Sequence, residues 1–230
     1  MKNIVLLNAR LITLFVFFLL GHSMSFAFDL LVQEADSLRR DALRDIDDGH
    51  TLDAQNKLIM ACEIYKKAEE WDKMSLCLYE RAIDYMNIQD LINMWKQTEL
   101  LRELSVGHPS AITQYNYHSV ASGYYSHLDS LDLAIQHGWC AIRALEQIDD
   151  PYAYNIVPVW SYYNMAFFYD MYFNLPQVDS IRYYLAKSRE VLKDSRTRKD
   201  SIEGLISVVD LEAWQEYYKM DYANAEKMML

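Results

Sequence analysis

Glycine and proline are scarce in this chain. Its 230 residues include only six glycines and four prolines. Because these residues interrupt helices and strands, their scarcity argues against a β-rich or loop-rich protein and favours long helices. With 52% hydrophobic residues, the chain can bury a core of its own, in one or two domains. Tyrosine, in contrast, is abundant, and its 18 residues suit helix contacts that end at a wet surface.

Recognisable catalytic motifs are also missing. The sequence contains no GxSxG, no Walker loop and no glycine-rich dinucleotide turn. Its histidines form neither HExxH nor a pair at i, i+4, so a helix-borne zinc site lacks its ligand spacing. Carboxylates are frequent, but at solvated helix ends nothing separates their pKa values as acid–base catalysis requires. We therefore predict a protein that is not an enzyme and that has no cofactor and no metal.

The N-terminus has the pattern of a secretory signal peptide. Lys2 and Arg10 supply positive charge, residues 11–21 form an apolar run, and Ser25-Phe26-Ala27 offers small residues for cleavage. The alternative is a membrane anchor, but the apolar run has about ten residues against the ~20 needed to span a bilayer. No cysteine follows that would carry a lipid. We expect residues 1–27 to be removed and the mature chain, from Phe28, to be secreted across the inner membrane into the periplasm.

Basic residues are outnumbered by acidic ones. The chain has 22 Lys and Arg against 33 Asp and Glu, for a formal charge of −11. Removal of the signal peptide takes away two basic residues and makes the charge −13. Such a surface repels nucleic acid phosphates and anionic lipid heads. We therefore expect no nucleic acid binding through this segment, whereas cationic or neutral partners are allowed.

Three cysteines, Cys62, Cys77 and Cys140, are an odd number for an oxidising compartment. Cys62 and Cys77 lie symmetrically about a turn near Glu69, so on antiparallel helices they could face each other and form a disulfide. The other reading is three small buried thiols. Helix rotation decides between the two, and the sequence does not fix it.

A pattern of small and aromatic residues recurs along the chain. A small residue, usually followed three residues later by Tyr, precedes a turn, and further small or apolar residues follow the turn at helical spacing. Such spacing lets two helices approach closely, while the aromatic ring fills the wedge where they diverge. The residues are Ala42, Ala54, Leu58 and Ala61; Ala82, Tyr85, Met94, Thr98 and Leu101; Ala121, Tyr124, Ala134, Gly138 and Ala141; Ala166, Tyr169, Ile181, Leu185 and Ser188; Tyr217 and Ala225.

Turn residues separate these helices. Within the pairs we expect turns at residues 49–51, 87–90, 127–130, 174–176 and 220–221. Between pairs, residues 105–110 and 149–151 end one helix and start the next, and residues 193–200 form a polar link. Asp129-Ser130 and Asp179-Ser180 are expected to cap the N-termini of second helices.

The pattern resembles the tetratricopeptide repeat (TPR) family, with a small residue and Tyr on helix A and two alanines on helix B. The resemblance covers nearly all of residues 28–230, although the repeats are about 38 to 46 residues long against ~34 in the family. It implies an all-α fold, a right-handed α-solenoid of about five TPR-like antiparallel helix pairs. The last pair is incomplete, and Ala225, Met228, Met229 and Leu230 leave an apolar stripe, so we expect the native protein to continue.

The resemblance also implies a binding groove. In TPR arrays the first helices of the pairs line a concave surface that binds a peptide or a partner helix. Carried over by register, the groove residues are Tyr115, His118, Ser122 and Tyr125 in the third pair, and Trp160, Tyr163, Phe167 and Asp170 in the fourth. Aromatic residues at helical spacing also suit a core. The groove reading requires Trp160 and Tyr163 to stay partly exposed.

Two functions remain open. The first is a non-enzymatic extracytoplasmic TPR scaffold that binds a protein or peptide. The second is the periplasmic sensor portion of a membrane-bound signal-transduction regulator, because the Asp-Ser and Tyr-Tyr pattern at residues 178–184 is similar to such proteins in Bacteroidetes-type bacteria. A histidine kinase or helix-turn-helix output and a downstream membrane anchor would then follow the repeats. The sequence leaves the oligomeric state open.

Overall fold

The computed structural model describes residues 28–154, 156–171, 178–193, 198–218 and 227–228, without the side chains of 198–201 and 217–218. The predicted signal peptide and the predicted turns at 174–176 and 220–221 lie outside these residues. So do Ala225 and most of the polar link expected at 193–200.

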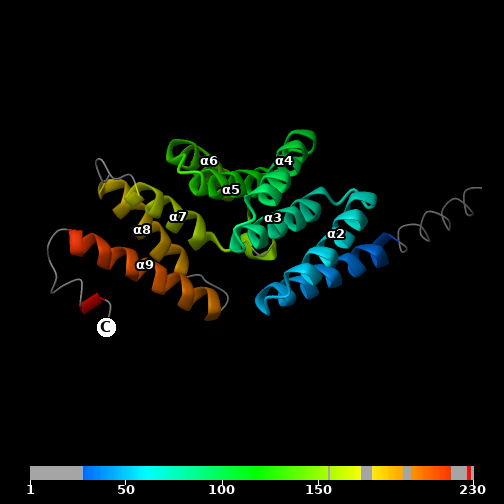
Figure 1. Cartoon of the computed structure of the whole chain (residues 1–230), viewed down its shortest axis with the longest axis horizontal. Helices are drawn as coiled ribbons and strands as arrows, with labels where there is room; N and C mark the ends of the chain where they lie inside the picture. Colours follow the sequence, from blue (N-terminus) through cyan, green and yellow to red (C-terminus); the bar gives the residue numbers. More distant parts are fainter. Residues whose placement is uncertain (1–27, 155, 172–177, 194–197, 219–226, 229–230) are drawn as a thin grey trace, which may run out of the picture. The chain divides into compact units, whose positions relative to one another are not determined.

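Every regular element in the described part of the chain is a helix (Figure 1). This confirms the predicted all-α fold of consecutive helix pairs. A helix over residues 28–47 comes first, and the others are α2 (Thr51–Lys67), α3 (Trp71–Asn87), α4 (Leu91–Gly107), α5 (Ala111–His127), α6 (Leu131–Leu145), a short 3₁₀ helix η1 (Pro151–Tyr154), α7 (Pro158–Met171), α8 (Val178–Leu192) and α9 (Arg198–Tyr218).

The first half of the chain has a regular period. Helices α2, α3, α4 and α5 each contain 17 residues, and the helices from α2 to α6 each begin 20 residues after the one before. A helix pair therefore occupies 40 residues here, within the 38 to 46 that the turn spacing predicts.

Most of the links in this half have one geometry. Gly49, Glu69, Gln89 and Asp129 have φ values of 77°, 59°, 60° and 54°, the left-handed conformation. In each link the next residue donates its N–H to a carbonyl five residues earlier, as in Glu70 to Tyr65 and Asp90 to Tyr85, both 2.9 Å. This is the bonding of a Schellman motif, which satisfies the free carbonyls at a helix end. The predicted turns at 49–51, 87–90 and 127–130 are all found.

The link between α4 and α5 is different. Pro109 follows the end of α4, and Ser110 starts α5 with a capping box, in which its hydroxyl accepts from Thr113 N at 3.0 Å and its own N–H donates to Thr113 Oγ1 at 2.9 Å. The predicted Ser cap at this boundary is confirmed.

Three predicted boundaries are wrong in detail. Ser130 stands at the N-cap of α6 but accepts no capping hydrogen bond, because the left-handed turn at Asp129 directs its hydroxyl back to the Leu128 carbonyl. Asp179 and Ser180 lie inside the first turn of α8 rather than before it. Residues 149–151 do not start an α-helix, because η1 follows and α7 begins only at Pro158.

By its internal contacts the chain divides into two compact units, residues 1–77 and 78–230, and α3 contributes to both. In the described part of the first unit, Ala42, Ala54, Leu58 and Ala61 are fully buried, as the small-residue pattern predicts. Tyr65 is also buried, and its hydroxyl donates to Asp36 Oδ1 at 2.6 Å.

The cysteines contain no disulfide. Cys62 and Cys77 are free and buried, so the prediction that allowed them to pair is wrong, and the reading as small thiols holds for them. Cys140 is free but only half-buried. The thiol of Cys62 donates instead to the carbonyl of Met74 at 3.8 Å, which satisfies it within the core.

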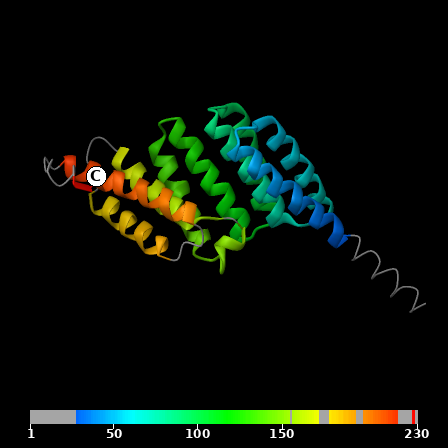
Figure 2. The same ribbon diagram turned by 90° about the horizontal axis from the view of Figure 1, so that it is seen from below.

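In the second unit, helices pack as antiparallel neighbours. The closest packing joins α5 to α6 and α7 to α8, and further contacts join α4 to α5, α6 to α7, and α9 to both α7 and α8. Figure 2 shows the green helices α5 and α6 running side by side. One hydrophobic core runs through these pairs and includes Ala134, Ala141, Met165, Ala166 and Ile181.

Candidate partner-binding surface

Three aromatic side chains form a ladder on one face of α7. Trp160, Tyr163 and Phe167 are spaced by three and four residues, so their side chains lie on one side of the helix. The rings of Trp160 and Tyr163 meet edge to face with centroids 6.0 Å apart, and those of Tyr163 and Phe167 stack at 6.3 Å. These contacts fix the rings relative to one another before any partner arrives.

The ladder is partly open to solvent. Phe167 is 38% exposed, and Trp160 and Tyr163 are half-buried. The opposite side of α7 carries the buried residues, among them Tyr162, Met165 and Ala166. The exposure that the groove reading requires of Trp160 and Tyr163 is therefore present.

Carboxylates adjoin this ladder. Asp170, the fourth candidate on α7, accepts a hydrogen bond from Gln215 of α9 at 2.5 Å. Partial burial raises the pKa of Asp170, and the Gln215 bond opposes part of that rise. Burial also raises the pKa of Tyr163, and the nearby charges of Asp210 and Asp170 add to the effect. The α7 surface therefore combines aromatic rings with negative charge.

Helix α9 extends the same surface. Asp210 and Trp214 are four residues apart, so they share a face of α9, and Trp214 is 45% exposed. Sequence reasoning missed both, because the fifth repeat was recognised only from residues near the end of α9. Hereafter the α7–α9 surface means Trp160, Tyr163, Phe167, Asp170, Asp210 and Trp214.

Two candidates from the third pair are core residues. Tyr115 is 2% and Ser122 is 5% exposed, so neither offers a surface to a partner. Tyr115 is covered because α7 packs over it, and its hydroxyl lies 3.0 Å from Ser161 Oγ. The Ser122 hydroxyl donates to the carbonyl of Ala134 on α6 at 2.7 Å. The register transferred from the fourth pair fails here because different neighbours cover α5.

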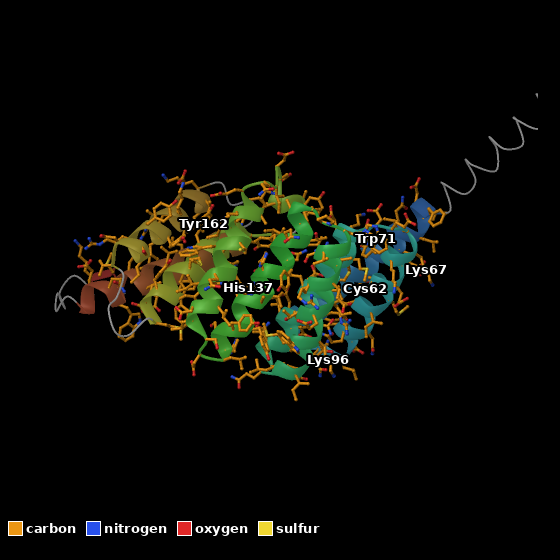
Figure 3. The ribbon with its side chains drawn as sticks, turned by 90° about the horizontal axis from the view of Figure 1, so that it is seen from above. Cys62, Lys67, Trp71, Lys96, His137 and Tyr162 are labelled. Atoms are coloured by element: carbon orange, nitrogen blue, oxygen red, sulfur yellow. The ribbon has the colours of Figure 1, made fainter. Side chains whose placement is uncertain are left out.

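The other two candidates of the third pair, His118 and Tyr125, contact α6. The Nδ1 atom of His118 lies 2.9 Å from Nδ1 of His137, and the ring of Tyr125 stacks on His137 at 5.4 Å. Trp95, Tyr117 and Tyr124 continue the cluster, with Trp95 and Tyr124 only 4.8 Å apart. Figure 3 labels His137 on the green ribbon, in the middle of the second unit's helices. These two candidates therefore belong to an aromatic cluster apart from the α7 ladder.

Electrostatics keep this histidine pair neutral. Burial lowers the pKa of His118 to about 4, and the neighbouring His137 lowers it further as a second cause. Burial also lowers the pKa of His137. Two neutral imidazoles can share one proton between their Nδ1 atoms, with one ring as donor and the other as acceptor.

An open cavity of about 410 Å³ lies next to the pair. His118 and Cys140 form part of its wall, together with the polar side chains of Gln114, Arg143 and Gln147. The start of α5 closes one end at Ser110. The cavity gives solvent and small solutes a route to the edge of His118.

Two searches of the described residues found nothing. No cluster of three or more His, Cys, Asp or Glu side chains there is arranged to hold a metal ion. None of the helices described is both long and apolar enough to cross a bilayer.

Comparison with known proteins gave no relative. No family model, no curated protein and no solved structure matches this chain.

Proposed function

We propose that this chain is a non-enzymatic scaffold of TPR-like helix pairs that binds a protein or peptide, and that the α7–α9 surface carries the affinity. The observation behind the proposal is the ladder of Trp160, Tyr163 and Phe167, which is ordered by ring contacts and stays partly exposed. Tryptophan and tyrosine are the residues that most often dominate binding energy at protein interfaces.

The charge of this surface favours a basic segment in the partner. Asp170 and Asp210 border the ladder, and the whole chain carries a formal charge of −11. A Lys or Arg side chain can place its charge over an aromatic face and beside a carboxylate at once. We therefore expect an extended peptide with alternating cationic and apolar residues.

The secretory pattern of residues 1–27 supports a place for this scaffold outside the cytoplasm, in the periplasm. Its partner is then an envelope or secreted protein rather than a cytoplasmic one. This placement rests on the sequence pattern described above.

Selection from a displayed random-peptide library tests the proposal. Peptides selected on the purified chain should be rich in Lys or Arg, and should bind Phe167→Ala and Trp160→Ala more than about tenfold more weakly. Trp139→Ala is the matched control, because Trp139 of α6 is 41% exposed but lies outside the α7–α9 surface. If the selected peptides lose binding in the control and keep it in the α7 variants, the surface is assigned wrongly.

A further inference from the structure

His118 and His137 come from the two antiparallel helices of one pair and face each other across it. Their Nδ1 atoms are 2.9 Å apart, their ring centroids 5.1 Å apart and their planes inclined by 44°. Positions 118 and 137 are symmetric about the link between α5 and α6, which ends and begins these helices at His127 and Leu131. Antiparallel packing therefore brings the two imidazoles to the same level of the pair.

The surroundings hold both rings in place. The Tyr117 ring lies 4.7 Å from His118 and meets His137 edge to face at 5.5 Å, while Tyr125 stacks on the other imidazole face. These contacts restrict the rotamers of both histidines, which lowers the ordering cost of binding anything between them. Half burial among aromatic rings also favours the neutral imidazole, the form that binds metals.

The spacing of the two nitrogens is close to that of a chelate. A nitrogen ligand stands ~2.0–2.1 Å from a zinc ion, so two such ligands at a right angle are about 3 Å apart. The separation of 2.9 Å fits this after a small rotation that turns both lone pairs toward one point. A metal ion would then replace the proton that the two Nδ1 atoms share.

We propose that His118 and His137 form a two-imidazole binding site for a divalent transition metal ion of the Zn²⁺ or Cu²⁺ type. Imidazole nitrogen is a preferred ligand of both ions. Water from the adjoining cavity completes the coordination, because only two protein ligands converge here. The negative charge of the chain favours a cation over an anion at this site. This revises the expectation of no metal, which rested on spacing within single helices.

The Cys140 thiol is not needed in this arrangement. It follows His137 by three residues on α6 and lines the same cavity as His118. Because a half-buried free thiol can bind soft metals alone, it is the main competing explanation for any metal uptake. The experiment must separate the two.

Calorimetric titration of the metal-free chain with Zn²⁺, purified without a polyhistidine tag, measures the site directly. We expect one ion per chain, and affinity reduced more than about tenfold in His118→Gln and in His137→Gln. His127→Gln, at the exposed end of the same helix, and Cys140→Ser should keep the wild-type affinity. Unchanged binding in both histidine variants, or loss in Cys140→Ser alone, would overturn the proposal.

A second measurement needs no variant and covers the case in which the glutamine substitutions disturb folding. The imidazole nitrogens of the wild-type chain are followed by ¹⁵N NMR as Zn²⁺ is added below one equivalent. Two histidines should respond together, and the electron paramagnetic resonance spectrum of added Cu²⁺ should show two nitrogen ligands. A response spread over all histidines would mean nonspecific binding and would refute the site.

Discussion

The histidine pair shows how one residue changes the meaning of another. Alone, His118 is a half-buried side chain on α5, and its pKa is lowered mainly by burial. With His137 opposite, protonation of either ring places a positive charge where the other can no longer share its proton. Protonation of both would place two like charges within hydrogen-bond distance. The pair is therefore sensitive to acid even without any ligand.

We predict that mild acid destabilises this chain through His118. Its folded pKa of about 4 lies below the ordinary 6.5 of the unfolded chain, so the unfolded state binds more protons between these values. The contribution to stability is complete above about pH 6.5 and is lost as the pH falls toward 4. Because the ring is partly exposed, solvent screening reduces the loss to roughly 1–2 kcal/mol.

Urea unfolding of the chain between pH 7.5 and pH 4.5, with a chelator present, measures this effect. The pH slope of the unfolding free energy should become smaller in His118→Gln and should not change in His127→Gln. Equal slopes in all three proteins would show that the pair does not titrate in this range.

At the scale of elements, one glycine sets the distance between α6 and α7. A Cβ atom built at Gly138 would lie 2.3 Å from Met165 Sδ and 3.4 Å from Ser122 Oγ. Met165 is fully buried, so it has little room to move aside. The small residue that the repeat pattern places here is required by packing, not by a turn.

Gly138→Val should therefore lower the free energy of unfolding by about 2–3 kcal/mol through overpacking. Gly107→Val is the matched control, because nothing lies within 4 Å of a Cβ at that helix end, and we expect a change below about 0.5 kcal/mol. Chemical denaturation of the two variants gives the comparison. A tolerated valine at position 138 would mean that α6 and α7 separate easily.

At the scale of the whole molecule, the sequence predicts the helices better than the surface. The small residues of the repeat pattern are buried as expected, because close helix packing needs them wherever the pair sits. Exposure of Tyr115 and Ser122 could not be predicted in the same way, because helical spacing names a face but not the neighbour that covers it. His137 was within reach: the symmetry argument applied to Cys62 and Cys77 also relates residues 118 and 137.

Stability should be uneven along the chain. In the helix over residues 28–47 only Ala35 and Ala42 are fully buried, whereas α5 buries residues along its whole length. Because local opening is easiest where little apolar surface is buried, we predict faster amide exchange in the first helix than in α5, by about tenfold or more. Hydrogen exchange followed by mass spectrometry compares residues 35–42 with Val120 and Ala121. Equal protection would indicate that the chain opens as one cooperative unit.

The repeated left-handed link gives the chain a unit of length. Residues 50–89 and 90–129 are consecutive segments of equal size, and each starts just after a left-handed residue and ends on the next but one or two such links, at Gln89 and Asp129. A gene duplication with its ends at these positions joins two backbones of the same conformation. It would lengthen the protein by one helix pair without inventing a new junction, so homologous chains should differ in length by steps of 40 residues.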